Sequence, residues 1–164
     1  MKVGYRVAII GCGLIGQKRS KTLAGAHLVA CVDTSLARAQ KLASQYSGCI
    51  ASDQWQAVAS SPDVDIVIIA TSHNSLAEIS RVSIAAGKHV LVEKPAARHV
   101  SELEGLAKLA KEKAVLVHVG FNHRYHRAFL KAREIVDSGA LGSLMFLRAR
   151  YGHGGRIDYD KEWR

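Results

Sequence analysis

The stretch VAIIGCGLIG, Val7–Gly16, decides the fold. Four apolar residues run into three glycines spaced as G-x-G-x-x-G, and a helical pattern follows. A strand, a glycine-rich turn and a helix in this order indicate the first βαβ unit of a dinucleotide-binding domain. In such a turn Gly11 permits the sharp bend, Gly13 lets a pyrophosphate approach the backbone, and Gly16 lets the helix pack on the strand.

Leu14 and Ile15 stand at the start of that helix. The first N–H groups of a helix have no partner inside it, and the helix dipole favours negative charge there. We therefore expect the backbone of these two residues to take part in binding the phosphates of a cofactor.

Strands and helices alternate along the rest of the chain. The strands are expected to be continuous apolar runs, which is typical of a parallel sheet covered on both faces. The sequence predicts the α/β class, with one doubly wound parallel-sheet Rossmann domain built from right-handed crossovers. In the helix expected at 100–114, Ser101 and Glu104 have the spacing of a capping box. Expected strands cover residues 5–11, 27–33, 63–71, 89–94, 115–120 and 142–152, and expected helices cover 14–26, 34–47, 74–87, 100–114 and 125–139.

The stretch at 142–152, GSLMFLRARYG, follows a full set of βα units, and no helical pattern comes after it. We interpret it as the first strand of a second α/β domain that is cut short. This interpretation assigns 1–122 to an NAD(P)-binding Rossmann domain, and 123–164 to a connecting helix and the truncated start of a substrate domain. An exposed apolar edge on that strand predicts pairing in a homo-oligomer.

Composition narrows the class of protein. The chain has 164 residues and 48% hydrophobic residues, enough for one domain with a core. No apolar run approaches the roughly 20 residues of a membrane helix, and no signal peptide is expected. Three cysteines without C-x-x-C spacing indicate reduced thiols in a cytoplasmic protein. The net charge of +9 is spread along a chain with 6% aromatic residues, which favours an anionic small molecule over nucleic acid as the partner.

Asp33 ends the second expected strand, at the position of the acid that accepts hydrogen bonds from an adenosine ribose. A carboxylate there binds the two ribose hydroxyls of NAD and repels the 2′-phosphate of NADP. Arg38 lies one turn into the next helix, which leaves NADP as an alternative. NAD is therefore the predicted cofactor.

Ligands of open α/β sheets bind at the carboxyl ends of the strands. VLVEKP, Val90–Pro95, places Glu93 and Lys94 at such an end. We expect Lys94 to be the catalytic residue: it would reach the nicotinamide ribose and the substrate hydroxyl, with a pKa lowered by burial. Glu93 would hold the lysine or a cofactor hydroxyl. The Lys94–Pro95 bond is a candidate cis peptide. The same argument places four residues beside the cofactor, namely Thr71, Ser72, His73 and Asn74.

Three histidines occur in HVGFNHRYH, at His118, His123 and His126. Their spacing fits no structural zinc site and no cysteine pair lies nearby, so no metal is expected. We instead expect His123 to lie near the substrate.

These motifs together resemble the N-terminal half of the Gfo/Idh/MocA oxidoreductases. The stretches that carry the resemblance are VAIIGCGLIG, CVD, IVIIAT, AAGKHVLVEKPAA, GFNHRYH and SGALGSLMFLRARYGHGGR. The resemblance implies an NAD(P)-dependent dehydrogenase acting on sugars, sugar nucleotides or polyols. It implies that Lys94 is the active-site lysine, and that Asn122 and Arg124 approach the nicotinamide and the substrate.

Two features depart from that family. TSHNSL has Ser72 and Leu76 where many members have proline and histidine. The family's second domain, which carries a proton-transfer histidine, is not expected here beyond its first strand. A second hypothesis therefore stands beside the oxidoreductase: a stand-alone NAD(H)-binding module, or a fragment, without turnover.

Overall fold

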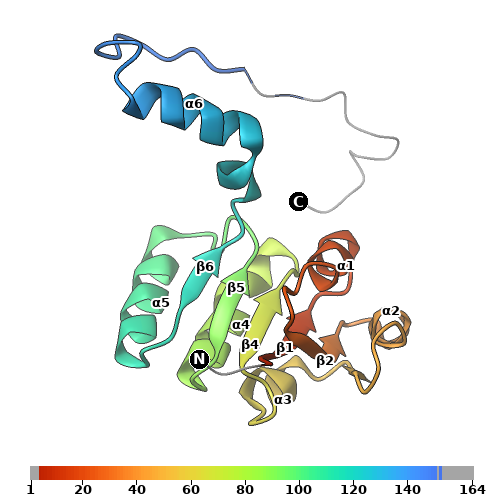
Figure 1. Ribbon diagram of the computed structural model, residues 1–164. Coiled ribbons are helices and arrows are strands. Elements are labelled where there is room, and N and C mark those ends of the chain that lie inside the picture. The colour runs from red at the N-terminus through yellow and green to blue at the C-terminus, as the bar shows by residue number, and fades with distance from the viewer. Residues whose placement is uncertain (1–3, 151, 153–164) are drawn as a thin grey trace. The chain divides into compact units, whose positions relative to one another are not determined.

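The computed structural model describes residues 4–150 and 152 (Figure 1). The chain forms two compact units, Met1–Gly120 and Phe121–Arg164. In the first unit six parallel strands form one sheet in the order β3-β2-β1-β4-β5-β6. The strands are β1 Arg6–Ile10, β2 His27–Val32, β3 Ile50–Ser52, β4 Ile66–Ile69, β5 His89–Val92 and β6 Val117–Val119. The helices between them are α1 Leu14–Ser20, α2 Leu36–Ala43, α3 Trp55–Ser60, α4 His73–Ala85 and α5 Val100–Glu112.

This strand order confirms the predicted doubly wound α/β fold. The chain runs outward from β1 to β3, returns through α3 to β4, and then continues outward to β6. The order therefore reverses between β1 and β4, which are neighbours with Val7 opposite Ile66 and Ile10 opposite Ile69. In open sheets of this kind the ligand crevice lies at the carboxyl edge, where the order reverses.

Two hydrophobic clusters cover the two faces of the sheet, because side chains alternate along each strand. Ala8 and Ile10 of β1 belong to the larger cluster, which includes buried residues of α3, α4 and α5. Val7 and Ile9 belong to the other cluster, together with Leu42 of α2. Burial on both faces explains why the strands read as continuous apolar runs.

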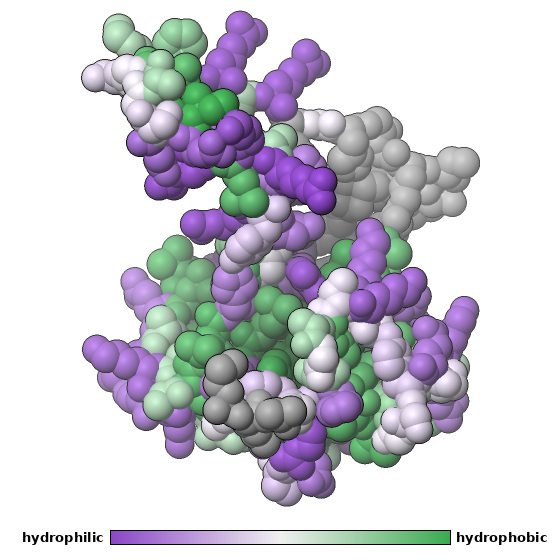
Figure 2. All heavy atoms as spheres, in the orientation of Figure 1, coloured by the Kyte–Doolittle hydropathy of each residue, from purple (hydrophilic) through white to green (hydrophobic). Residues whose placement is uncertain are grey.

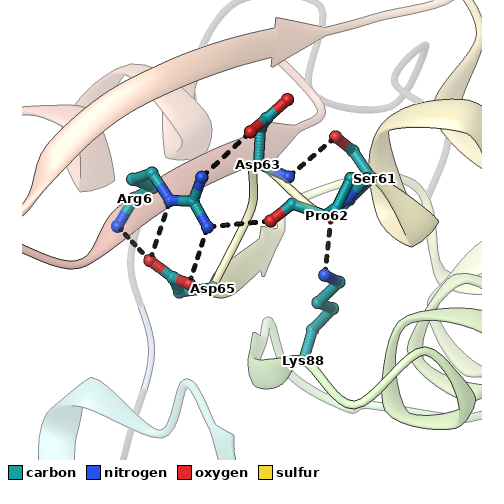
Figure 3. Close-up of polar contacts among 6 residues, drawn as sticks. All are labelled: Arg6, Ser61, Pro62, Asp63, Asp65 and Lys88. Atoms are coloured by element: carbon teal, nitrogen blue, oxygen red, sulfur yellow. Dashed lines mark hydrogen bonds and ion pairs between the residues drawn. The ribbon is translucent and has the colours of Figure 1, made fainter.

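A group of polar contacts lies at the amino edge of the sheet (Figure 3). The Arg6 guanidinium donates to both carboxylate oxygens of Asp65, to Asp63 at 3.0 Å and to the carbonyl oxygen of Pro62 at 2.8 Å. Lys88 is buried and donates to the carbonyl oxygen of Ser61 at 2.6 Å. These contacts attach the start of β1 and the α4–β5 turn to the loop that leads into β4.

Two elements have no counterpart in the sequence predictions. β3 has three residues and α3 has six, which is too short to show a period or an apolar run. The strand expected third along the chain is β4. The start of α5 also differs, because Glu102 and not Glu104 makes the capping contacts: its carboxylate accepts from the backbone N–H groups of Arg98 at 3.0 Å and His99 at 3.1 Å.

The second unit contains the 3₁₀ helix η1, Asn122–Tyr125, and the helix α6, Arg127–Asp137. The predicted strand at 142–152 is wrong for the residues that the structure describes: 143–150 have no regular secondary structure. A strand requires a neighbour for its backbone hydrogen bonds, and no described strand pairs with this segment. The predicted homo-oligomer therefore has no formed strand to support it.

Within α6 two ion pairs link successive turns, from Lys131 to Glu134 and from Arg133 to Asp137, each at 2.6 Å. The ring of Phe129 stacks edge-on against His123 and His126. Apolar and hydrophilic side chains both reach the visible surface of this unit (Figure 2).

Candidate functional site

Two of the three glycines in the loop between β1 and α1 are constrained by packing. Gly11 has a φ of +99°, and a Cβ atom there would lie 2.5 Å from the backbone of Ala70. A Cβ atom at Gly16 would lie 1.9 Å from the carbonyl oxygen of Gly11. At Gly13, by contrast, a Cβ atom would meet no atom within 4 Å. The outer two glycines are therefore required by packing, whereas Gly13 leaves open space above the loop.

Asp33 follows β2 and connects the glycine loop to α2. Its Oδ2 accepts a hydrogen bond from the backbone N–H of Cys12 at 2.9 Å. Its Oδ1 accepts from the N–H of Ser35 at 2.9 Å and from the Arg38 guanidinium at 2.8 Å. The side chain is 8% exposed. Since a carboxylate offers about four acceptor sites, Oδ2 retains capacity for a ribose hydroxyl.

The same contacts set the charge of Asp33. Burial alone would raise the pKa of this carboxyl, but the hydrogen bonds from Ser35, Arg38 and Cys12 outweigh it, so the pKa lies below its usual value. Asp33 is therefore an anion at neutral pH.

A groove of about 340 Å³ lies at this carboxyl edge. It brings together Gly11, Gly13, Asp33 and Arg38 with Thr71 and Ser72, which follow β4. Asp53 and Trp55 are among the lining residues that the sequence reasoning missed. They follow β3, and recognition of that short strand would have placed them at the same edge of the sheet.

A larger groove, of about 690 Å³, lies between α4 and α5. Its lining comes from the two helices, and the glycine loop and Asp33 take no part in it. The smaller groove, by contrast, is lined by the glycine loop and the Asp33 carboxylate, which are groups typical of phosphate and ribose binding.

Glu93 and Lys94 follow β5 at the carboxyl edge, as predicted. The Lys94–Pro95 peptide bond is cis. Glu93 is half-buried, and its carboxylate is paired with Arg19 of α1. Lys94, however, is exposed, so the burial expected to lower its pKa is not present.

The other predicted site residues divide between the two units. Leu14 and Ile15 occupy the first turn of α1 with exposed side chains, and their expected part in binding phosphate stays a prediction. His73 and Asn74 begin α4, and Ser72 is the N-cap residue, with its hydroxyl donating to Asn74 Oδ1 at 2.8 Å. The remaining three, Asn122, His123 and Arg124, lie in η1 of the second unit.

The family model of oxidoreductases with an NAD-binding Rossmann fold, Gfo/Idh/MocA, matches residues 5–121. The chain belongs to this family. The match covers the six strands and the crevice of the first unit, so this Gfo/Idh/MocA unit is an NAD-binding domain.

Three proteins show what this chain is similar to. The chain is 31% identical to the inositol 2-dehydrogenase of Gluconacetobacter diazotrophicus over 152 residues, which cover 88% of this chain and 45% of that protein. GenD2 from gentamicin A biosynthesis, solved in complex with NAD, has 27% identity and a TM-score of 0.80, over 85% of this chain and 41% of its own. Biliverdin reductase from Synechocystis, solved with biliverdin and NADP⁺, has 30% identity and a TM-score of 0.73, over 80% of this chain and 42% of its own.

The chain thus spans less than half the length of these similar proteins, between 41% and 45%. In the part of the chain that is described, no helix is long and apolar enough to cross a membrane. No group of three or more His, Cys, Asp or Glu side chains is placed there to share a metal ion. Cys12, Cys31 and Cys49 are free thiols.

Proposed function

We propose that this chain is the cofactor-binding part of a dehydrogenase that acts on a sugar, a sugar nucleotide or a polyol. The observation that carries the proposal is the arrangement of one edge of the sheet. The glycine loop, Asp33 and the segment Glu93–Pro95 all follow the carboxyl ends of strands. One NAD molecule bound along this edge would extend from the Asp33 groove toward Lys94.

In the proposed mechanism each residue has a limited task. NAD supplies the hydride acceptor when it is bound. Gly13 and the first turn of α1 would hold the pyrophosphate through backbone N–H groups, and Asp33 would hold the adenosine ribose. The Lys94 ammonium would donate a hydrogen bond to the substrate oxygen and stabilise it as an alkoxide after its hydroxyl proton has passed to solvent. A carbonyl then forms when the adjoining carbon gives up its hydride. The roles of His73, Asn74, Asn122, His123 and Arg124 in binding cofactor or substrate stay predictions.

We further propose that NAD is preferred to NADP. The Asp33 carboxylate is an anion beside the ribose position, and it already binds the guanidinium of Arg38. A 2′-phosphate would have to approach this anion and draw Arg38 away from it. Tighter binding of NADPH than NADH at equal ionic strength would contradict this preference.

We also propose a cytoplasmic location, which the free thiols support.

A second candidate is an NAD(H)-binding module without turnover. One observation favours it: Lys94 is exposed, whereas the catalytic lysine was expected to be buried. Such a module would bind NADH with the same dependence on Gly13 and Asp33.

A steady-state assay separates the two candidates. The 164-residue chain is incubated with NAD⁺ and a panel of polyols and sugars that includes myo-inositol, and NADH formation is followed. The dehydrogenase predicts turnover that falls about 100-fold or more in Lys94→Met. Lys111→Met, which removes an exposed lysine of α5, should leave turnover unchanged. NADH binding without turnover on any compound would favour the module, and unchanged turnover in Lys94→Met would exclude the proposed role of Lys94.

A further inference from the structure

Arg19 lies in the last turn of α1 and reaches across to the residue before Lys94. Its Nε donates to Oε1 of Glu93 at 2.7 Å, and its terminal nitrogen Nη2 is paired with the same oxygen. The Arg19 and Glu93 side chains are 25% and 12% exposed. A half-buried ion pair with two donors on one carboxylate oxygen holds that carboxylate in place far better than an exposed pair does.

Gly120, the residue after β6, lies directly against this ion pair. A Cβ atom on Gly120 would lie 2.9 Å from Nη2 of Arg19 and 2.9 Å from Oε1 of Glu93. The backbone N–H of Gly120 donates to the carbonyl oxygen of Val92 at 2.8 Å, which keeps the glycine against the end of β5. The ends of α1, β5 and β6 therefore enclose the Glu93 carboxylate.

Lys94 is the next residue after Glu93, and it is exposed. Among the residues with described contacts, the Lys94 ammonium has no ion pair, whereas Glu93 has Arg19. If Arg19 did not occupy Glu93, the carboxylate would be free to turn toward the neighbouring ammonium. A paired ammonium is a poorer hydrogen-bond donor to a substrate oxygen, because one of its N–H groups and part of its charge are already engaged.

We propose that Arg19 is a positioning residue that binds Glu93 and thereby leaves the Lys94 ammonium unpaired for the substrate. This inference rests on the proposed role of Lys94. The alternative is that the ion pair only stabilises the fold. Both hypotheses predict some loss of stability when Arg19 is replaced. Only the positioning role predicts a change in the pKa of Lys94 that depends on Glu93.

The test measures the pKa of Lys94 directly and needs neither cofactor nor substrate. Lysines of the full chain are reductively methylated with ¹³C-formaldehyde, and their NMR signals are titrated with pH. Lys94→Arg identifies the Lys94 signal. The variants are Arg19→Gln, Glu93→Gln and the double variant. Lys18→Gln is the matched control, since it removes an exposed cation from the same turn of α1.

The proposal predicts that Arg19→Gln raises the pKa of Lys94 by about 0.5 to 1 unit, because the released carboxylate favours the charged ammonium. In a chain that already carries Glu93→Gln, Arg19→Gln should raise the pKa of Lys94 by less than half as much, since only the direct repulsion between Arg19 and Lys94 is lost. Lys18→Gln should cause a smaller rise than Arg19→Gln. An equal rise in both backgrounds, or no rise at all, would overturn the proposal.

Two further variants keep the test decisive if Arg19→Gln does not fold. Arg19→Lys retains a cation for Glu93 and should leave the pKa of Lys94 close to that of the unchanged chain. Gly120→Ala introduces the Cβ atom that crowds the pair, and it should raise the pKa of Lys94 without any change of charge. A Lys94 pKa that stays unchanged in Gly120→Ala while Arg19→Lys raises it would also overturn the proposal. Failure of NADH binding would challenge the proposed function and leave this result untouched.

Discussion

Asp33 joins three parts of the crevice through one carboxylate. It binds the N–H of Cys12 in the glycine loop, the N–H of Ser35 at the start of α2, and the guanidinium of Arg38. Each of these contacts to an ionised group contributes about 1.5–3 kcal/mol in typical proteins. The residue that is expected to recognise the ribose therefore also shapes the loop that is expected to bind the pyrophosphate.

Two glycines of the loop allow a matched pair of substitutions. Gly16→Ala places a methyl group against the backbone of Gly11, so it should lower the free energy of unfolding by about 1–3 kcal/mol or more. Gly13→Ala meets no atom, so stability should be nearly unchanged while the methyl group obstructs the pyrophosphate and NADH binds about 10-fold or more weakly. Urea unfolding and an NADH titration of both variants check this. A stable Gly16→Ala protein, or a Gly13→Ala protein with full affinity, would contradict these roles.

Asp33 also predicts a pH dependence of stability. Its pKa is lower in the folded chain than in the unfolded chain, so its contribution is present above the unfolded value of about 3.9. That contribution is lost as the pH falls through the lower, folded value. The unfolding midpoints of the chain and of Asp33→Asn should therefore differ at pH 7 and converge below about pH 4. Asp53→Asn, at an exposed position, serves as the control. A difference in unfolding midpoint between the chain and Asp33→Asn that stays constant with pH would contradict the prediction.

At the scale of elements, the start of α5 offers two glutamates that could cap the helix, and the structure uses one of them. Both Glu102 and Glu104 lie near the beginning of this helix. Glu102 accepts from two backbone N–H groups before the helix, those of Arg98 and His99, and these bonds hold the pKa of Glu102 below its usual value. The capping residue is thus His99, two positions before the serine that the sequence pattern favours.

Glu102→Ala should accordingly lower the urea midpoint of the chain, because it removes the acceptor for both N–H groups. The loss should be present at pH 7 and disappear in acid, since the lowered pKa of Glu102 makes its contribution greatest above its unfolded value. Glu104→Ala removes an equivalent charge two residues later and should have little effect. Equal losses in the two variants would show that charge at this helix start, and not the specific cap, is responsible.

The sequence predicted the long elements and failed on the short ones. β1, β2, β4 and β5 are buried on both faces, so each shows an apolar run that a single sequence reveals. β3 is held by pairing with β2, and such long-range pairing leaves no local signal. The stretch 142–152 has apolar residues of the right kind, yet the described part of it lacks a partner strand. Apolar character alone therefore does not form a strand.

The same distinction applies to the candidate site. Gly11, Gly13, Gly16 and Asp33 were predictable because their motif has a fixed spacing along the chain. The pairing of Arg19 with Glu93 was not predictable, because it joins residues 74 positions apart and depends on how α1 packs against β1 and β4.

At the scale of the whole molecule, the crevice residues Gly11, Asp33 and Thr71 all belong to the unit Met1–Gly120. The family match also lies almost wholly within it, over residues 5–121. This unit has its own sheet and both hydrophobic clusters. A unit with its own core is expected to fold alone.

A protein shortened to Met1–Gly120 should therefore unfold in one cooperative transition and bind NADH within about threefold of the affinity of the full chain. Circular dichroism during urea unfolding and an NADH titration measure the two properties. A shortened protein that is folded but has lost NADH affinity would mean that residues after Gly120 contribute to cofactor binding.

A fluorescence titration of the 164-residue chain with NADH, and with NADPH alongside, tests most directly whether this edge of the sheet binds NAD. We expect saturable binding that favours NADH and that weakens about 10-fold or more in Asp33→Ala, through loss of the ribose contacts. Absence of saturable binding by either nucleotide, or binding indifferent to Asp33→Ala, would contradict it.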